Sequence, residues 1–479
     1  MWLGIGQFFN MALAFVSAAI LSRYFDKTDY GTYRQVMYVY TSLTMIFTAG
    51  LPSVFAYFIP RYNEGQAKTL INKINRLFLL LGAAMSLVLF IGADFFAQAM
   101  KNPELSNGIK YFSIFPLFTF PAMGVEGIYT AIKRTKYIAI YQLINKSLML
   151  LFIVAPVILF NGTYLTAIIG WGIASFLTFL VSIYLKNKPY KDVVSIHIPN
   201  IYRTILNYSV PLMGASCVGM LIYIADQFFI SRYFGIEVFA EFSNGYISLP
   251  FVGMIAGSMK AVLLPIFSKA SVDNSLDSAF NSYNNAVFKT AVLLFPLLFY
   301  CGFFAKDIMI FLYGDKYVTS SVYFQMSVIK SFFEVFPIIT IILAIGKSKL
   351  YFYFHLIFAL ITWLTYYMAI IFIPSPIIIA ILSVVLFVLL LFAFLLYLYF
   401  NLNIKLLSLK LGLELIKIIL NCLIVISFVS LISALYFNQM HLIYKLLITI
   451  SLFYVVLIPT GRIIKVDYLK SFTSIINKK

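Results

Sequence analysis

Charged side chains inside apolar runs are the residues of this sequence whose chemistry can be interpreted. A lysine or aspartate at the centre of a bilayer costs about 2.5–3.5 kcal/mol on insertion scales, so its presence requires a reason. Lys330 lies near the middle of such a run, and Glu334 follows one helical turn later on the same face. Two interpretations stand: a structural ion pair between packed helices, or a pair lining a cavity whose carboxylate can titrate.

Two further lysines lie within apolar runs. Lys146 follows Gln142 and Asn145 by four residues and one residue, which places a polar stripe deep in its run. We expect this stripe to face a wet cavity and not lipid. Lys260 lies nearer the end of its run, so its stem can reach the headgroups, and a place in the cavity is the alternative.

Acidic candidates are few. Glu126 and Asp226 lie near the ends of their runs. Each can pair with a neighbouring base or, together with Glu334, bind a proton or sodium ion that drives transport. His355 is interpreted mainly as a buried, hydrogen-bonded histidine, with proton coupling as the alternative.

A tetrapeptide occurs twice, as Ser22-Arg23-Tyr24-Phe25 and Ser231-Arg232-Tyr233-Phe234, each ending an apolar run. A second echo pairs Arg134-Thr135-Lys136 with Lys347-Ser348-Lys349, at nearly the same separation. We infer a duplicated unit of roughly 210 residues. Arg23, Arg232 and also Arg34 lie at the ends of runs, where they either anchor the helices at the interface or form a basic rim on a cavity mouth.

Glycine and proline interrupt three runs. Gly50 and Pro52 break one, Pro211 bends another, and Gly253 and Gly257 are spaced by four residues in a third. Proline removes a helical hydrogen bond, and spaced glycines allow close helix packing. These positions are candidate hinges, with plain packing as the alternative.

No catalytic constellation, phosphate-binding glycine loop or metal-ligand spacing is present, so we expect no enzyme activity and no cofactor. Cys217, Cys301 and Cys422 lie far apart within apolar runs and predict neither a disulfide framework nor a metal site. The net charge of +18 is attributed to topology signals and anionic lipid headgroups, and not to nucleic acid.

The elements that must position these residues are membrane-spanning helices. The chain is 62% hydrophobic and 11% charged, with a mean hydropathy of +0.96, far from an ordinary soluble domain. We therefore predict an all-α polytopic membrane protein with about fourteen transmembrane helices. The expected spans cover residues 2–22, 32–60, 70–98, 107–132, 136–160, 163–186, 203–232, 237–268, 280–312, 318–346, 349–373, 376–400, 411–436 and 441–461.

Basic residues predict the orientation. Loops after even-numbered spans, together with the C-terminal tail, carry more than twice as many lysines and arginines as the other loops, which places them and both termini in the cytoplasm. We expect a six-helix bundle over 1–186, a cytoplasmic linker over 187–202, a second six-helix bundle over 203–400, and two additional helices with a basic tail over 401–479. The two bundles have parallel topology, and proteins built in this way hold substrate between the halves.

Several motifs resemble those of a known family. Ser22-Arg23-Tyr24-Phe25 with Asp29-Tyr30-Gly31-Thr32-Tyr33 resembles the opening of bacterial polysaccharide flippases, and Ala344-Ile345-Gly346-Lys347-Ser348-Lys349 resembles their step between spans 10 and 11. These are the Wzx-type polysaccharide transporters of the multidrug/oligosaccharidyl-lipid/polysaccharide exporter superfamily. The resemblance implies a basic central cavity, which agrees with Lys146, Lys260, Lys330 and the arginines.

The resemblance also implies a function and a location. A flippase would move an undecaprenyl-pyrophosphate-linked oligosaccharide to the outer leaflet for O-antigen, capsule or exopolysaccharide synthesis, by alternating access in the bacterial inner membrane. Its partners would be that lipid-linked glycan, membrane lipids, and the polymerase and glycosyltransferases of the pathway, with the chain itself a monomer. The alternatives are a multidrug or cation exporter of the same superfamily and a membrane glycan polymerase or ligase.

Overall fold

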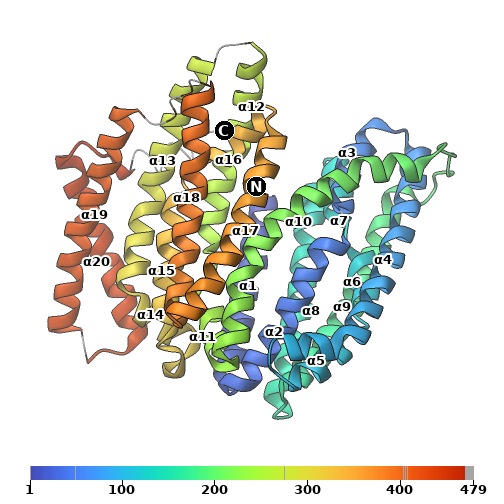
Figure 1. Cartoon of the computed structure of the whole chain (residues 1–479), viewed down its shortest axis with the longest axis horizontal. Helices are drawn as coiled ribbons and strands as arrows, with labels where there is room; N and C mark the ends of the chain where they lie inside the picture. The colour runs from blue at the N-terminus through green and yellow to red at the C-terminus, as the bar shows by residue number, and fades with distance from the viewer. Residues whose placement is uncertain are drawn as a thin grey trace. The chain divides into compact units, whose positions relative to one another are not determined.

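The computed structural model describes residues 2–48, 50–273, 276–402, 404, 406, 408–437 and 439–469. Over these residues every regular element is a helix (Figure 1), which confirms the predicted all-α class. By their internal contacts the helices form two compact units, Met1–Ala240 and Glu241–Lys479. The division predicted at 187–202 follows the sequence repeat and stays a prediction.

The first unit contains α1 to α10. Its elements are α1 (Trp2–Tyr24), α2 (Lys27–Phe47), α3 (Leu51–Phe58), η1 (Ile59–Arg61), α4 (Glu64–Ala99), α5 (Glu104–Phe112), α6 (Pro116–Ala122), α7 (Val125–Ala131), α8 (Thr135–Leu159), α9 (Tyr164–Asn187), η2 (Lys188–Tyr190) and α10 (Ile201–Phe234). Helix α11 (Ile236–Gly245) spans the boundary between the units.

The second unit continues from α12 to α20. Its elements are α12 (Pro250–Val272), α13 (Leu276–Phe303), α14 (Ala305–Tyr313), η3 (Asp315–Tyr317), α15 (Ser320–Phe333), α16 (Ile338–Ala344), α17 (Ser348–Phe372), α18 (Pro376–Leu402), α19 (Leu409–Tyr436) and α20 (Leu442–Ile463). Helix α19 packs on α13, and α20 packs on α19 and α14 (Figure 1). An ion pair of 2.7 Å between Lys445 and Asp307 joins α20 to α14.

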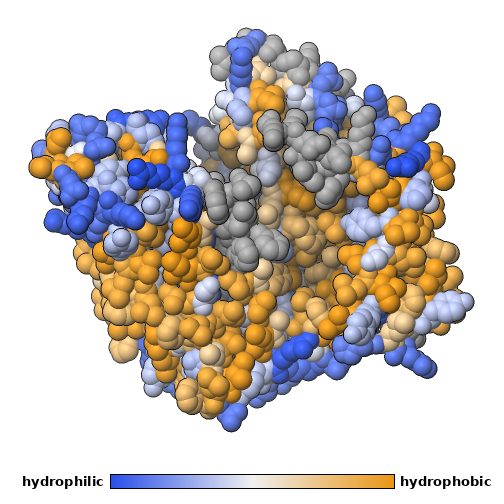
Figure 2. Space-filling model, turned by 180° about the vertical axis from the view of Figure 1, so that it is seen from behind, coloured by the Kyte–Doolittle hydropathy of each residue, from blue (hydrophilic) through white to orange (hydrophobic). Residues whose placement is uncertain are grey.

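Nine helices among the described residues are long and apolar enough to cross a membrane, or up to twelve if each of three bent pairs is one span. Helices α1 and α10, where spans 1 and 7 were expected, are outside that count, and the total of fourteen stays a prediction. Apolar side chains cover the middle of each unit, and hydrophilic residues gather at its ends (Figure 2). Exposed Leu80, Ile91 and Phe95 of α4 belong to this apolar surface and would face lipid.

Local sequence explains where the helices begin. The Asp26 side chain accepts a hydrogen bond from the Asp29 N–H at 2.7 Å and caps α2. Asn63 and Gln66 form a reciprocal capping box at the start of α4. Such caps satisfy backbone donors that have no partner in the first turn of a helix.

The breaks inside apolar runs lie at glycine and proline. Gly50 has a φ of 68° and precedes Pro52 at the start of α3, and the axis bends by 46° between α2 and η1. Gly124 has a φ of 94° at the break between α6 and α7, where a Cβ would collide with the Phe55 ring. Only glycine adopts such a backbone there without strain.

The other predicted hinge residues lie in continuous helices. Among the described residues, a Cβ on Gly253 or Gly257 of α12 would meet nothing within 4 Å. Pro211 lies in α10, and its side chain is outside the described residues. A hinge role for all of these positions stays a prediction.

Both sequence echoes correspond to helix boundaries. The two tetrapeptides lie at the C-terminal ends of α1 and α10. Arg134 and Lys347 are the N-caps of α8 and α17, which are both 25 residues long. The preceding helices α7 and α16 are both seven residues long and, like α8 and α17, begin 213 residues apart (125 to 338 and 135 to 348).

Candidate functional site

One face of α9 carries polar side chains into the interior of the first unit. Trp171, Ser175, Thr178, Ser182 and Lys186 recur at spacings of three or four residues, which places them on one side of a helix. All except the half-buried Trp171 are less than 5% exposed. Polar groups inside a membrane protein are expensive to bury and mark candidate functional positions.

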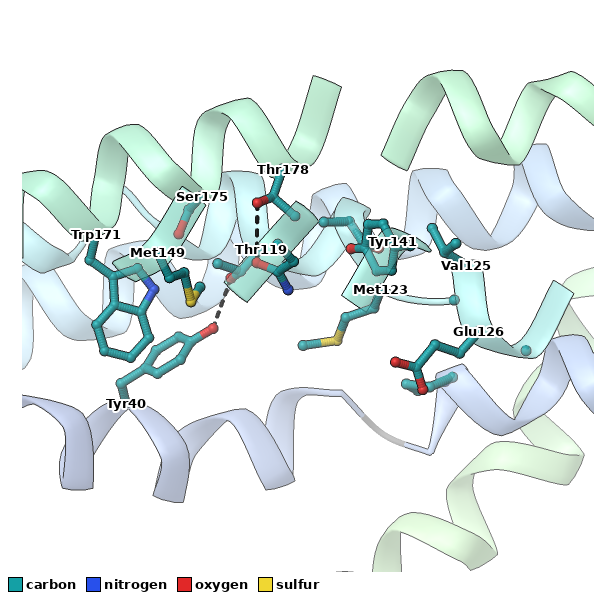
Figure 3. A pocket seen from close by; sticks show the side chains of 15 residues that line it. Tyr40, Thr119, Met123, Val125, Glu126, Tyr141, Met149, Trp171, Ser175 and Thr178 are labelled. Carbon is teal, nitrogen blue, oxygen red and sulfur yellow. Dashed lines mark hydrogen bonds between the residues drawn. The ribbon is translucent and has the colours of Figure 1, made fainter. Parts of the chain in front are cut away.

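The N-terminal part of this stripe, Trp171, Ser175 and Thr178, lines a pocket of about 360 Å³, hereafter the α9 pocket (Figure 3). Its walls come from α2, α3, α6, α7, α8 and α9, together with the residues between α6 and α7. The lining residues are Tyr40, Pro52, Thr119, Ala122, Met123, Gly124, Val125, Glu126, Gly127, Tyr141, Asn145, Met149, Trp171, Ser175 and Thr178.

Two hydrogen bonds tie the walls of the α9 pocket together. The Tyr40 hydroxyl of α2 donates to the Thr119 hydroxyl oxygen of α6 at 2.9 Å. The Thr178 hydroxyl of α9 donates to the Asn145 side-chain oxygen of α8 at 3.2 Å. Figure 3 shows Trp171, Ser175 and Thr178 extending from α9 on the side opposite to Tyr40 of α2.

The predicted polar stripe of α8 is part of this site. Asn145 lines the α9 pocket, and Gln142 donates from Nε2 to the Glu126 carboxylate at 2.8 Å. Lys146 is half buried, is not a lining residue, and has no hydrogen bond or ion pair to any residue in the described part of the chain. Of the three polar residues in the α8 stripe, Asn145 therefore lines the pocket, Gln142 binds Glu126 at its wall, and Lys146 is not among the lining residues.

Lys186, at the C-terminal end of the α9 stripe, was expected at the edge of the cytoplasmic linker. It is 1% exposed, and its ammonium donates to Asn75 Oδ1 at 2.9 Å and to the Pro121 carbonyl at 2.6 Å. The nitrogen also lies 5.6 Å from the ring centroids of Phe55 and Phe78. Lys186 thus connects α9, α4 and α6 next to the break that precedes α7.

In the second unit the predicted cation and carboxylate positions come together. Lys330 of α15 places its ammonium 5.4 Å from the Tyr246 ring and 5.2 Å from the Phe387 ring. Glu334 follows at the C-cap of α15 and interacts electrostatically with both Lys330 and Lys260 of α12. All three charged side chains are half buried, which leaves part of each available to a ligand or to water.

The predicted rim arginines differ in their surroundings. Arg232 of α10 is half buried, and its guanidinium donates to the carbonyl of Ala99, the last residue of α4, at 2.6 Å. A cation at this position is favoured by the helix dipole. Arg34 of α2 is half buried, and Arg23 at the end of α1 is exposed. The repeated tetrapeptide therefore does not give Arg23 and Arg232 the same exposure.

Asp226 and His355 lie apart from these clusters. Asp226 in α10 is 6% exposed, and its carboxylate accepts from the Gln227 N–H at 2.7 Å. His355 in α17 is also 6% exposed, with Nδ1 2.9 Å from the Tyr351 carbonyl. This contact agrees with the interpretation of His355 as a buried, hydrogen-bonded histidine.

The fold of this chain is similar to those of several solved membrane proteins. It is similar to lipid II flippase MurJ in an inward closed conformation, with a TM-score of 0.72 and 19% identity over 96% of this chain and 99% of that chain. It is also similar to an inward-facing multidrug resistance MATE family transporter of the MOP superfamily, with a TM-score of 0.64 and 12% identity over 82% of this chain and 94% of that one.

A third similar structure is a MOP superfamily transporter from Pyrococcus furiosus, described as having a binding pocket of reverse polarity that suggests a different function. Its TM-score is 0.60, with 13% identity over 84% of this chain and 95% of that one. Among curated proteins no sequence matches this chain.

The sequence itself identifies the family. A model of the family described as polysaccharide biosynthesis protein matches residues 1–271, which is more than half of the chain. The protein belongs to this family. It is a multi-pass helical membrane protein, and the resemblance inferred from its motifs is confirmed.

Proposed function

We propose that this protein is a flippase that moves an undecaprenyl-pyrophosphate-linked oligosaccharide repeat unit from the cytoplasmic to the outer leaflet of the bacterial inner membrane. The product would supply O-antigen, capsule or exopolysaccharide synthesis. The observation that carries the proposal is membership of the polysaccharide biosynthesis family together with a fold shared end to end with a lipid II flippase. Transport and not catalysis is the proposed activity.

The charges of the chain support an anionic substrate. A pyrophosphate cannot cross hydrocarbon unpaired, because burying an unpaired charge is very costly. Half-buried cations lower that cost electrostatically, and we assign this role to Arg34, Lys146, Arg232, Lys260 and Lys330, with Arg23 at the mouth. Proton or sodium coupling through Glu126, Asp226 or Glu334 is part of the proposal, as is alternating access with both termini in the cytoplasm.

Deletion of the gene tests the proposal. We expect an undecaprenyl-pyrophosphate-linked oligosaccharide to accumulate on the cytoplasmic leaflet and surface glycan to disappear, with both restored by a plasmid copy. Unchanged lipid-linked glycans and unchanged surface polysaccharide would contradict the proposal.

Export of cationic drugs is the second candidate, because a multidrug resistance MATE transporter shares the fold and Glu126 lines the α9 pocket. Attraction of cations requires an excess of acidic groups, whereas lysine and arginine outnumber aspartate and glutamate by 35 to 17 in this chain. Ethidium efflux that depends on this protein would favour the second candidate.

A further inference from the structure

The α9 pocket contains polar donors that no other part of the described chain satisfies. The Ser175 hydroxyl and the Trp171 indole N–H are buried without a hydrogen-bond partner among the described residues. Ser175 is 2% exposed, and both residues line the pocket. An unsatisfied buried polar group carries a desolvation cost, so a ligand that bonds to these groups would be favoured.

The remaining polar groups of the pocket offer one more donor and one acceptor. The Asn145 oxygen already accepts from Thr178, which leaves its amide N–H groups to donate. The Glu126 carboxylate receives one hydrogen bond from Gln142 and retains further acceptor capacity. A ligand complementary to this site accepts several hydrogen bonds and also donates one to a carboxylate.

A simple ion would leave most of these groups unused. A metal cation cannot use the N–H groups of Trp171 and Asn145, which have no lone pair to offer. An anion would meet the Glu126 carboxylate, and the described residues that line the pocket include no lysine or arginine. Hydroxyl groups both donate and accept hydrogen bonds, so a neutral polyhydroxylated molecule matches the donors and the acceptor of the pocket.

The walls favour a ring with apolar faces. The aromatic side chains of Tyr40 and Trp171 and the thioether of Met149 border the same space (Figure 3). Sugar rings present C–H faces to such walls and hydroxyls at their rims. A volume of about 360 Å³ lies within the range of small-ligand pockets and accommodates one sugar ring.

We propose that the α9 pocket binds one sugar residue of the transported glycan, with Ser175, Trp171 and Asn145 donating to its oxygens and Glu126 accepting from a hydroxyl. The inference rests on the proposed function for the origin of the sugar. It places recognition of the glycan inside the first unit, at residues distinct from the lysines and arginines assigned to the pyrophosphate.

Trp171 is a built-in reporter for the experiment. The chain has three tryptophans, so the Trp2→Phe/Trp363→Phe protein leaves Trp171 as the sole indole. The purified full-length protein, in constant sodium chloride, is titrated with glucose, galactose, rhamnose and N-acetylglucosamine, and with choline chloride. We expect a saturable change in Trp171 emission with at least one sugar and none with choline chloride. Absence of a response to every sugar, or a saturable response to choline chloride alone, overturns the proposal.

Ser175→Ala and Ser182→Ala form the matched pair. Both serines lie buried on the same face of α9, but the Ser182 hydroxyl already donates to the Phe179 carbonyl at 2.8 Å. We expect Ser175→Ala to weaken sugar binding about fivefold, the loss of one hydrogen bond, and Ser182→Ala to leave binding unchanged. Equal effects of the two variants would overturn the assignment of Ser175.

Failure of this inference is distinguishable from failure of the proposed function. If deleting the gene leaves lipid-linked glycans unchanged while Trp171 still reports a bound sugar, the flippase proposal fails and the pocket stands. If deletion causes accumulation but no sugar alters Trp171 emission, the flippase proposal stands and the pocket assignment fails.

Discussion

A buried lysine with neutral partners is the most unusual residue of the first unit. Lys186 is bonded to an amide oxygen and a backbone carbonyl and lies near two aromatic rings. Desolvating an ammonium group is costly, and these contacts offset part of the cost. The Pro121 carbonyl that it bonds lies in the last turn of α6, where backbone carbonyls lack helical partners.

Replacing Lys186 with methionine tests this role. Lys186→Met keeps most of the stem volume but leaves the Pro121 carbonyl and Asn75 without their partner, so we expect a loss of about 1–3 kcal/mol in the free energy of unfolding. Thermal unfolding of the detergent-solubilised protein measures the change. Lys188→Met is the control, because Lys188 is exposed. Equal unfolding temperatures for the two variants would show that the buried contacts contribute nothing.

The assignment of Lys146 and Lys330 to the pyrophosphate predicts an effect on glycan export. Lys146→Ala and Lys330→Ala should each lower glycan export at least about tenfold, because a charge-assisted hydrogen bond contributes about 1.5–3 kcal/mol, while protein abundance stays unchanged. Lys136→Ala and Lys349→Ala are matched controls at exposed positions in the first turns of α8 and α17. Normal surface glycan in Lys146→Ala and Lys330→Ala cells would remove these lysines from the site.

At the scale of elements, breaks in the helices determine where polar groups can gather. The break between α6 and α7 places Glu126 beside the α9 pocket and Pro121 beside Lys186. Gly124 permits this break because its φ of 94° is unfavourable for residues with a side chain. Gly253 and Gly257 of α12 lie in regular helix, and a Cβ there would meet no other described residue within 4 Å.

Alanine substitutions separate these two kinds of glycine. Gly124→Ala should destabilise the protein by more than about 1 kcal/mol, because the added Cβ collides with Phe55 and the backbone is strained. Gly253→Ala should instead stabilise it by about 0.5–1 kcal/mol, the usual difference within a helix. Thermal unfolding measures both. A stable Gly253→Ala protein with slow export would support a hinge in α12, and a neutral Gly124→Ala would contradict the strain argument.

The positions of many helices could be predicted from the sequence, but the contacts of individual side chains could not. Short breaks at Arg134 and Lys347 predicted helix starts that the structure has as N-caps of α8 and α17. Lys186 was expected only as the last residue of the span 163–186, at the edge of the cytoplasmic linker. Its spacing from Ser175, Thr178 and Ser182 is the signal that could have placed it on the buried face of α9.

At the scale of the whole molecule, polar chemistry is concentrated inside each unit. The first unit has a carboxylate and unpaired donors in the α9 pocket, and in the second unit Glu334 interacts electrostatically with Lys260 and Lys330. Sequence alone could name the charged members of both groups, since charges are rare in apolar runs. It could not name the neutral members, because serine, tryptophan and tyrosine occur throughout membrane helices.

Reconstituted vesicles test the central claim most directly. The purified protein is placed in liposomes loaded with the undecaprenyl-pyrophosphate-linked oligosaccharide extracted from deletion cells, and its exposure on the opposite leaflet is followed with a membrane-impermeant sugar oxidant. We expect the glycan to become accessible in all vesicles that contain the protein, and more slowly when Lys330→Ala replaces the wild type. Accessibility no greater than in protein-free vesicles would contradict the flippase account.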